Sequence, residues 1–245
     1  MRRIPSASID SLRPPTARHT PDHQIFTSIK QLWHDRVASV ALEFAFIAPA
    51  FIALLFGALQ VALIYLAQEG LETAVENSAR LIMTGTAQTM TLTGKTSAGL
   101  AAADFKTAVC NGISGTDVNG NAVSYPAALP PLLSCSRVAV NVEIMPAGCT
   151  APNISAPTYT YTNGNLTSTG SGYGASNCAG TTNTNNGLSG TQGQLVVVQL
   201  SYLWPTISAP LGFNFVNQPN GNRLILATYV VTVENYVCAT GVSTC

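Results

Sequence analysis

The feature that most constrains this chain is an uninterrupted apolar run near its N-terminus. Phe44–Ala67 contains 24 residues, of which Gln60 is the one polar member, and none is charged. At about 1.5 Å per residue, a helix of this length is roughly 36 Å long, which is enough to cross a hydrocarbon core of about 30 Å. The run therefore predicts a membrane-spanning helix. The alternatives are a buried helix of a soluble protein and a cleaved secretory signal, whose apolar core is shorter, about 7–15 residues.

Charges flank this run asymmetrically. Basic residues precede it and glutamates follow it: Lys30, Arg36, then Glu69, Glu72 and Glu76. Because Lys and Arg near a membrane helix favour the cytoplasmic side, we expect the N-terminus in the cytoplasm and residues 69–245 outside it. Only 9% of the chain is charged and its net charge is zero. A nucleic-acid-binding protein normally carries a clustered basic face, so nucleic acid is not an expected partner.

The cysteines agree with this orientation, because all six follow the apolar run: Cys110, Cys135, Cys149, Cys178, Cys238 and Cys245. An even number of cysteines in an oxidising compartment predicts up to three disulfides. Cys135–Cys149 and Cys238–Cys245 are candidate pairs, although the spacing does not decide the connectivity. A zinc site is the alternative, but the exported part has no His and no C-x-x-C pair, so no metal is expected.

The pattern divides the chain into three segments. Residues 1–36 are rich in Pro, Ser and Arg without apolar periodicity, which predicts a disordered basic cytoplasmic tail or leader. Residues 37–84 form one long helix, with about residues 44–67 in the membrane. Its second half is amphipathic, since apolar or small residues recur at helical spacing: Leu71, Ala74, Val75, Ser78, Ala79 and Ile82. Glu76 and Arg80 form a favourable pair on the other face, and Gly85 stops the helix.

Residues 85–245 are expected to form an exported α+β domain. Strand patterns occupy residues 137–145, 195–204 and 222–234, and a short helix is expected at residues 100–109. Residues 146–193 are rich in Thr, Asn, Gly and Ser and predict a loop that is either pinned by a disulfide or partly mobile. The predicted fold class is therefore α+β, with a single N-terminal transmembrane helix that continues as an amphipathic helix packed on a small antiparallel sheet.

Residues suited to catalysis are sparse in the exported part. It has no His, which excludes a Ser-His-Asp or Cys-His centre. Its carboxylates are Glu69, Glu72, Glu76, Asp104, Asp117, Glu143 and Glu234. Glu143 alternates outward on its strand and is expected to be solvated. No phosphate loop, dinucleotide motif or cofactor site is present, so we predict that the protein is not an enzyme.

Residues 36–49, RVASVALEFAFIAP, carry a family resemblance. They resemble the TadE-like family of tight-adherence pilus-assembly proteins, which are pseudopilins. The family pattern combines a small-residue patch, a Glu-Phe-Ala motif, a later Pro, a Phe-Gly pair and an Ala-Arg helix end, matched here by Glu43, Phe44, Ala45, Pro49, Phe56, Gly57, Ala79 and Arg80. The resemblance covers about residues 36–85 and implies a pilin-like fold.

The resemblance also implies a function. Members are structural components in the assembly of tight-adherence (Flp-type) pili, or in secretion, at the bacterial inner membrane. The implied partners are other pilins and pseudopilins, the inner-membrane platform proteins, the prepilin peptidase and the lipid bilayer, without a cofactor. The peptidase would cut between Ala38 and Ser39, with Glu43 and Phe44 as part of the processing motif. Relatives usually have Gly before the cut, where this chain has Ala38.

Glu43 and Pro49 are the residues expected to contact other subunits in the membrane. Cleavage would create an α-ammonium at Ser39, which Glu43 of a neighbouring subunit can pair with in lipid. The alternative is a rim charge of no consequence, because a carboxylate near the interface costs less than the about 2.5–3.5 kcal/mol of a central one. Pro49 lacks the N–H that would bond Ala45, so it is either a kink or simply tolerated.

Two further hypotheses belong to other functional classes. A membrane-anchored surface binding or adhesion protein would use the loop 146–193 as its ligand platform. Tyr159, Tyr161 and Tyr173 of this loop are candidates to contact carbohydrate, and the alternative is that they are simply exposed to solvent. An exported enzyme would depend on Asp104, Asp117 or Glu234.

Overall fold

The computed structural model describes residues 36–145, 158–169, 175–176, 192–206, 214–218 and 221–237. The chain divides into an N-terminal unit, Met1–Ile52, and a C-terminal unit, Ala53–Cys245. The described helices are α2 (Arg36–Met83), α3 (Thr86–Thr89), α4 (Ala102–Asn111) and the short 3-10 helix η1 (Cys135–Arg137). The strands are β1 (Thr91–Leu92), β2 (Ile113–Thr116), β3 (Ala122–Tyr125), β4 (Val138–Met145), β5 (Thr158–Thr162), β6 (Asn165–Thr169), β7 (Ala175–Ser176), β8 (Leu195–Pro205) and β9 (Asn222–Thr232).

Helix α2 contains both the apolar run and the amphipathic segment. It is the one helix of the described chain that is long and apolar enough to cross a membrane, and an 18-residue window within it has a mean hydropathy of 2.3. The helix ends before Gly85, whose φ of 76° and contact with the Tyr236 ring both exclude a side chain there. The predicted Glu76–Arg80 pair is confirmed at 2.8 Å. One long apolar helix near the N-terminus fits a single-pass membrane protein.

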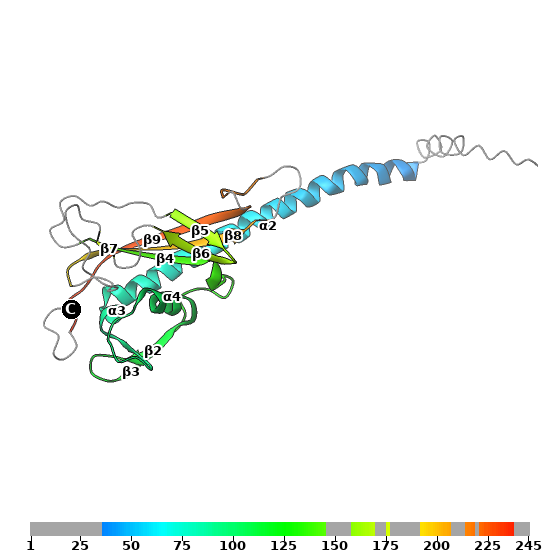
Figure 1. The fold of residues 1–245 in the computed structure, drawn as a ribbon. Coiled ribbons are helices and arrows are strands. Elements are labelled where there is room, and N and C mark those ends of the chain that lie inside the picture. Colours follow the sequence, from blue (N-terminus) through cyan, green and yellow to red (C-terminus); the bar gives the residue numbers. More distant parts are fainter. Residues whose placement is uncertain are drawn as a thin grey trace, which may run out of the picture. The chain divides into compact units, whose positions relative to one another are not determined.

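The largest sheet is four-stranded, in the order β7-β4-β8-β9. Strands β4, β8 and β9 are mutually antiparallel, and β7 pairs parallel with β4. One face of this sheet packs on the second half of α2, as Figure 1 shows. The shared core consists of alternate strand residues and the small-residue face of the helix: Leu71, Ala74, Val75, Ala79, Ile82, Val138, Val142, Ile144, Val196, Val198, Leu200, Ile225, Ala227 and Val231. The predicted α+β fold class is therefore confirmed.

A hairpin covers part of the opposite face of this sheet. The sequence pattern predicts only a loop over these residues. Strands β5 and β6 lie within residues 146–193 and pair antiparallel around Asn163 and Gly164. Leu166 of β6 is 1% exposed and packs against Ala139 and Leu203 of the sheet. The strand β4 is thus buried on both faces, so its alternation does not mark a solvated side. The other residues of 146–193, apart from β7 and residues 192–193, lie outside the described residues.

A smaller layer packs against α2 from the side away from the four-stranded sheet. It contains α4 and the antiparallel sheet β1-β2-β3 (Figure 1). Phe105, Ala108 and Val109 of α4 are buried in the same core as α2. They lie on one face of α4 because their spacing follows the helical repeat. The amphipathic half of α2 is therefore covered by two layers of the C-terminal unit.

One disulfide corrects a predicted pairing. Cys110, in the last turn of α4, is bonded to Cys135 at the start of η1. The sulfur of Cys135 is therefore not available to Cys149, the partner that its spacing suggested. The chain between the two cysteines folds back along α4, since the N–H groups of Ala128 and Leu129 both donate to the Val109 carbonyl. The remaining four cysteines lie outside the described residues.

Candidate functional site

The predicted processing region lies at the start of α2. Ala38 and Ser39 belong to its first turn, and Glu43 follows one turn after Ser39. The Glu43 side chain is exposed, and its neighbours Phe44 and Phe46 are 71% and 75% exposed. Neither ion pair of the described part of the chain involves Glu43. Glu43 is therefore a charged group on an apolar helix surface that other described residues leave uncovered.

The helix does not place Glu43 and Pro49 on the same face. At about 3.6 residues per turn, six positions along a helix correspond to a rotation of about 240° around its axis. Glu43 instead shares its face with Ile47, one turn further on, which is 66% exposed. Pro49 lies inside α2, which continues through it to Met83. A neighbouring helix that covers Glu43 would therefore not cover Pro49 at the same time.

A second group of polar residues lies between the four-stranded sheet and the hairpin. Glu143 is only 2% exposed and accepts a hydrogen bond of 2.8 Å from the Asn141 side chain. The expectation of a solvated Glu143 is therefore wrong, because the hairpin covers the face that strand alternation assigned to solvent. Nearby, Tyr159 donates to Gln199 at 3.1 Å, and buried Ser201 donates to a backbone carbonyl. Burial, reinforced by the charge of Glu143, raises the pKa of Tyr159 even though a hydrogen bond with Ser201 opposes it.

This polar group joins the hairpin to the sheet. The guanidinium of Arg137 lies 5.5 Å from the ring centre of Tyr161, a cation–π geometry. Tyr159 and Tyr161 are both engaged with the sheet layer, whereas the sequence predicts either carbohydrate contacts or simple solvent exposure on a loop. Tyr173, the third such residue, lies outside the described residues. Tyr159 and Tyr161 therefore pack the hairpin against the sheet.

The carboxylates considered for an exported enzyme lie on three separate elements. Asp104 accepts the Ala101 N–H at 3.2 Å at the start of α4. Asp117 closes the β2–β3 turn, where hydrogen bonds from the Asn121 side chain and backbone lower its pKa. Glu234 is exposed and follows β9. In the described ranges, no group of three or more His, Cys, Asp or Glu is placed to hold a metal ion.

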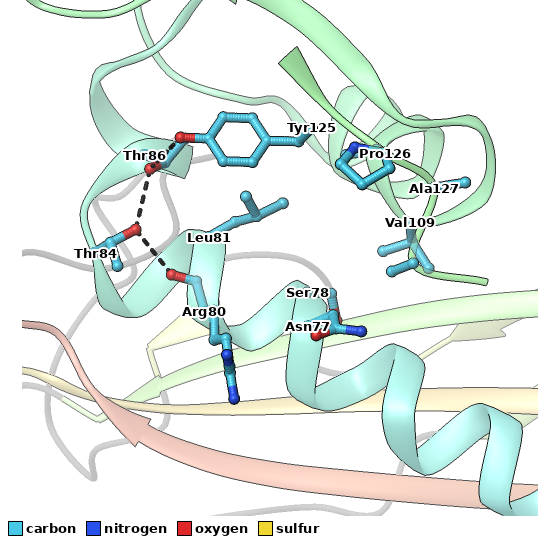
Figure 2. A pocket seen from close by; sticks show the side chains of 12 residues that line it. Asn77, Ser78, Arg80, Leu81, Thr84, Thr86, Val109, Tyr125, Pro126 and Ala127 are labelled. Atoms are coloured by element: carbon cyan, nitrogen blue, oxygen red, sulfur yellow. Dashed lines mark hydrogen bonds between the residues drawn. The ribbon is translucent and has the colours of Figure 1, made fainter. Parts of the chain in front are cut away.

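A groove of about 470 Å³ lies between the end of α2 and the smaller layer (Figure 2). Its lining residues are Asn77, Ser78, Arg80, Leu81, Thr84, Thr86, Ala108, Val109, Tyr125, Pro126, Ala127 and Ala128. Figure 2 shows a chain of hydroxyls at one end, where Thr84 and Thr86 lie 3.0 Å apart and Thr86 and Tyr125 lie 3.4 Å apart. The guanidinium of Arg80 points away from this chain. The groove is mainly apolar and suits an apolar side chain better than a charged substrate.

The hairpin had a signal in the sequence that the loop prediction did not use. Residues 158–169 read TYTYTNGNLTST, in which an alternating Thr-Tyr run precedes Asn163-Gly164 and a Thr-rich run follows it. Asn-Gly between such runs is a strong short-range hairpin signal because both central residues must take a positive φ. The φ angles of Asn163 and Gly164 are 51° and 81°. The groove at the end of α2 had no such local signal, since its lining comes from three separate segments.

Comparison with known proteins supports the resemblance seen in the sequence. A family model described as TadE-like protein matches residues 38–80. The match begins at Ala38, includes Glu43 and Pro49, and ends at Arg80 in the amphipathic half of α2. It confirms the resemblance for this segment. No curated protein and no solved structure matches the chain.

Proposed function

We propose that this chain, whose residues 38–80 match the TadE-like family, is a pseudopilin-like component in the assembly of tight-adherence pili. The family match points to a pilus-related function in general. The finer role is structural rather than catalytic: the membrane helix joins an assembly, and the C-terminal unit is carried outside the cytoplasm. In this proposal the protein is located in the bacterial inner membrane, and its N-terminus lies in the cytoplasm.

The observation that carries this proposal is the placement of Glu43. It is the one charged residue between positions 37 and 68, and its side chain is exposed on an apolar helix. A carboxylate that remains without a partner in lipid is costly, about 2.5–3.5 kcal/mol at the helix centre and less toward the rim. A positive partner supplied by another subunit would offset that cost.

Processing supplies such a partner. Cleavage between Ala38 and Ser39 by a prepilin peptidase would leave an α-ammonium on Ser39. Ser39 and Glu43 lie four residues apart in α2, so both groups are at the same end of the helix. The Glu43 carboxylate of one subunit would pair with the Ser39 ammonium of its neighbour. The partners of the chain are then other pilins and pseudopilins, the platform proteins and the peptidase.

The test compares Glu43→Gln with Glu69→Gln in cells that form the pili. Both residues are exposed on α2, but Glu69 lies beyond the apolar run. We expect Glu43→Gln to reduce surface pili about tenfold or more, since the loss of about 1.4 kcal/mol per contact already gives that factor. Glu69→Gln should leave piliation unchanged. Normal piliation of the Glu43→Gln strain would overturn the proposal.

N-terminal sequencing tests the processing step separately. The mature protein from wild-type cells should begin at Ser39, and the protein from cells without the peptidase should keep the residues before it. If both proteins begin at the same residue, the proposed cut is wrong.

A further inference from the structure

The outer edge of β9 is the edge of the four-stranded sheet that faces away from β8. Among the described strands, β9 pairs with β8 alone, in a continuous register along its whole length. Leu224–Thr232 contains no charged residue and no proline. Natural proteins usually protect a sheet edge with charges, proline or a bulge, because an open edge pairs with other strands. This part of β9 carries none of these protections.

The start of this edge is satisfied within the chain. The Asn217 side chain accepts the Leu224 N–H at 2.7 Å and donates to the Leu224 carbonyl at 3.2 Å. The Gln68 side chain donates to the Leu226 carbonyl at 3.0 Å. Leu224 and Leu226 therefore direct backbone groups outward, and the partners of those groups come from the same chain.

Further along β9, the outward groups have no such partner. Backbone groups of a strand alternate between its two sides, so Thr228, Val230 and Thr232 face outward like Leu224 and Leu226. Within the described ranges, no hydrogen bond engages the outward N–H or carbonyl of Thr228, Val230 or Thr232. This stretch, Thr228–Thr232, is called the open edge here and is about 13 Å long. It presents the N–H and carbonyl groups that an added strand requires.

The side chains beside the open edge are also uncovered. Val230 shares its face of the sheet with Leu224, which packs against the hairpin cluster, yet Val230 itself is 52% exposed. Thr228 and Thr232 on the same face are exposed too. On the α2 face, Tyr229 is 39% exposed. An added strand would therefore meet a β-branched row on one face and an aromatic ring on the other.

Helix α2 and strand β9 run in the same direction. One contact joins the Gln68 side chain to the Leu226 carbonyl, and a later contact joins the Glu234 N–H to the Met83 carbonyl at 2.9 Å. Residue numbers therefore increase the same way along both elements. A level on the helix can be converted into a level on the strand.

A carboxylate without an ion-pair partner lies beside the open edge. The amide nitrogen of Gln68 that donates to the Leu226 carbonyl also donates to Glu72 at 2.7 Å. From Gln68 to Glu72 the helix advances about 6 Å, or about two residues of strand, so Glu72 is level with Thr228. Neither ion pair of the described residues involves Glu72. The charge at this edge is therefore negative, and it favours a positive side chain on an incoming strand.

We propose that the open edge binds an extended segment of another polypeptide, which adds to the sheet as a strand antiparallel to β9. Such β-strand addition takes its affinity from main-chain hydrogen bonds and its specificity from alternate side chains. An antiparallel ladder is also slightly more stable per residue than a parallel one. The segment that fits has β-branched residues beside Val230 and Lys or Arg between them. Those basic residues lie on the α2 face, near the Tyr229 ring and the Glu72 carboxylate.

A second copy of the chain fits this edge less well. Two β9 strands paired antiparallel would turn their α2 helices in opposite directions, because α2 runs with β9. Copies with the same charge bias insert into one bilayer in the same direction. The edge of a second copy would also offer Tyr229 and Val231, rather than a cation, on the face of Glu72. The occupant is therefore a different segment, and the inference rests on the open edge and not on the proposed role in pili.

The probe is a fluorescein-labelled heptapeptide in which four lysines alternate with three valines. Fluorescence anisotropy measures its binding to the full chain in nonionic detergent. We expect saturable binding to the wild-type protein. A peptide with glutamates in place of the lysines should bind about tenfold more weakly. Absence of saturable binding would overturn the proposal, including the case in which another part of the chain covers the edge.

Methylation of peptide nitrogens tests the ladder without altering the protein. In an antiparallel ladder, the residues opposite Thr228, Val230 and Thr232 direct their N–H groups toward β9, and in the probe these are the valines. We expect N-methylation of the valines to abolish binding. N-methylation of the lysines between them should change the affinity by about twofold or less. Equal effects, or the reverse order, would contradict the antiparallel addition.

A variant of the edge tests the same ladder from the side of the protein. Val230→Pro removes an outward N–H that the β8–β9 ladder does not use, and proline is tolerated at such edge positions. We expect it to weaken peptide binding about tenfold, whereas Val230→Thr, which keeps the N–H, should change binding by about twofold or less. Unchanged binding to Val230→Pro would contradict the proposal. A wild-type dimer in sedimentation that Val230→Pro dissociates would also overturn it, because a second copy would then be the occupant.

The charge preference is tested by Glu72→Gln, with Glu69→Gln as the matched control. Glu69 carries the same charge on α2 but lines a pocket with residues 130–133 instead of the edge of β9. We expect Glu72→Gln to weaken the lysine peptide about threefold, as the loss of an exposed ion pair does. Glu69→Gln should leave the affinity unchanged. Equal effects of the two variants would show that net charge, rather than the edge, attracts the peptide, and would contradict the predicted basic residues.

Discussion

The two halves of α2 differ in hydrophobic pattern and in which of their side chains other residues cover. In the first half, Leu42, Phe46 and Phe51 are 50%, 75% and 59% exposed. In the second half, Leu71 and Ile82 are both 0% exposed. The first half is apolar all around the helix, whereas the second is apolar on one face and carries Glu, Thr, Asn and Arg on the other. A helix of the first kind needs lipid on every side, and a helix of the second kind needs a protein layer.

This contrast indicates which surroundings each half of α2 requires. Contiguous exposed apolar surface of this extent is not stable in water and marks contact with a membrane or another protein. The second half satisfies its apolar face within the C-terminal unit and leaves its polar face to water. The change of pattern, rather than the length of the helix, therefore marks where the layers of the C-terminal unit begin to cover α2.

The largest effect is expected when one leucine from each half is truncated. Leu71→Ala should lower the unfolding free energy of the C-terminal unit by about 2–5 kcal/mol, because it opens a cavity in a closed core. Leu59→Ala should change it by about 0.5 kcal/mol or less, because its surroundings are lipid or detergent rather than packed protein. Denaturant titration in detergent, followed by the fluorescence of Trp204 with Trp33 changed to Phe, measures both. Equal losses in the two variants would show that the two halves are not covered differently.

A smaller effect is expected from the disulfide that holds the layer over the second half. The Cys110→Ser, Cys135→Ser variant opens a loop of 25 residues and should cost about 3 kcal/mol in the unfolding free energy. The loss comes mainly from the greater freedom of the unfolded chain. The same titration under oxidising conditions measures it, and the wild-type protein with reductant is the matched control. An unchanged midpoint would mean that α4 contributes little to covering α2.

The smallest effect belongs to the polar face of the second half. Arg80 and Glu76 are 63% and 42% exposed in their ion pair. Arg80→Ala should lower the unfolding free energy by about 0.5 kcal/mol or less, since water and salt screen such pairs. Measurements at low and high salt check this, because the difference should shrink as salt increases. A loss above that of Leu71→Ala would show that this face is covered by a partner.

Much of the fold could be predicted because its signals are local. The apolar run, the small-residue face of α2, the stop at Gly85 and the three long strands each depend on residues close together in the sequence. The Asn163-Gly164 hairpin also has a local signal, because its turn and its two strands are adjacent in the sequence. Glu43 too was identifiable from the sequence, because a lone charge in an apolar run stands out without any structure.

Local patterns in the sequence were enough to predict a helix long and apolar enough to cross a membrane, the α+β class and the family motif around Glu43, because periodicity and charge act over one or two turns. The tertiary fold was needed to show that Cys135 bonds Cys110, that Glu143 is buried and that the β5–β6 hairpin covers the sheet. Each of these depends on segments distant in sequence meeting in space. Strand alternation says which side chains share a face, but not what covers that face, and an apolar run says that a helix avoids water, but not whether lipid or protein surrounds each turn.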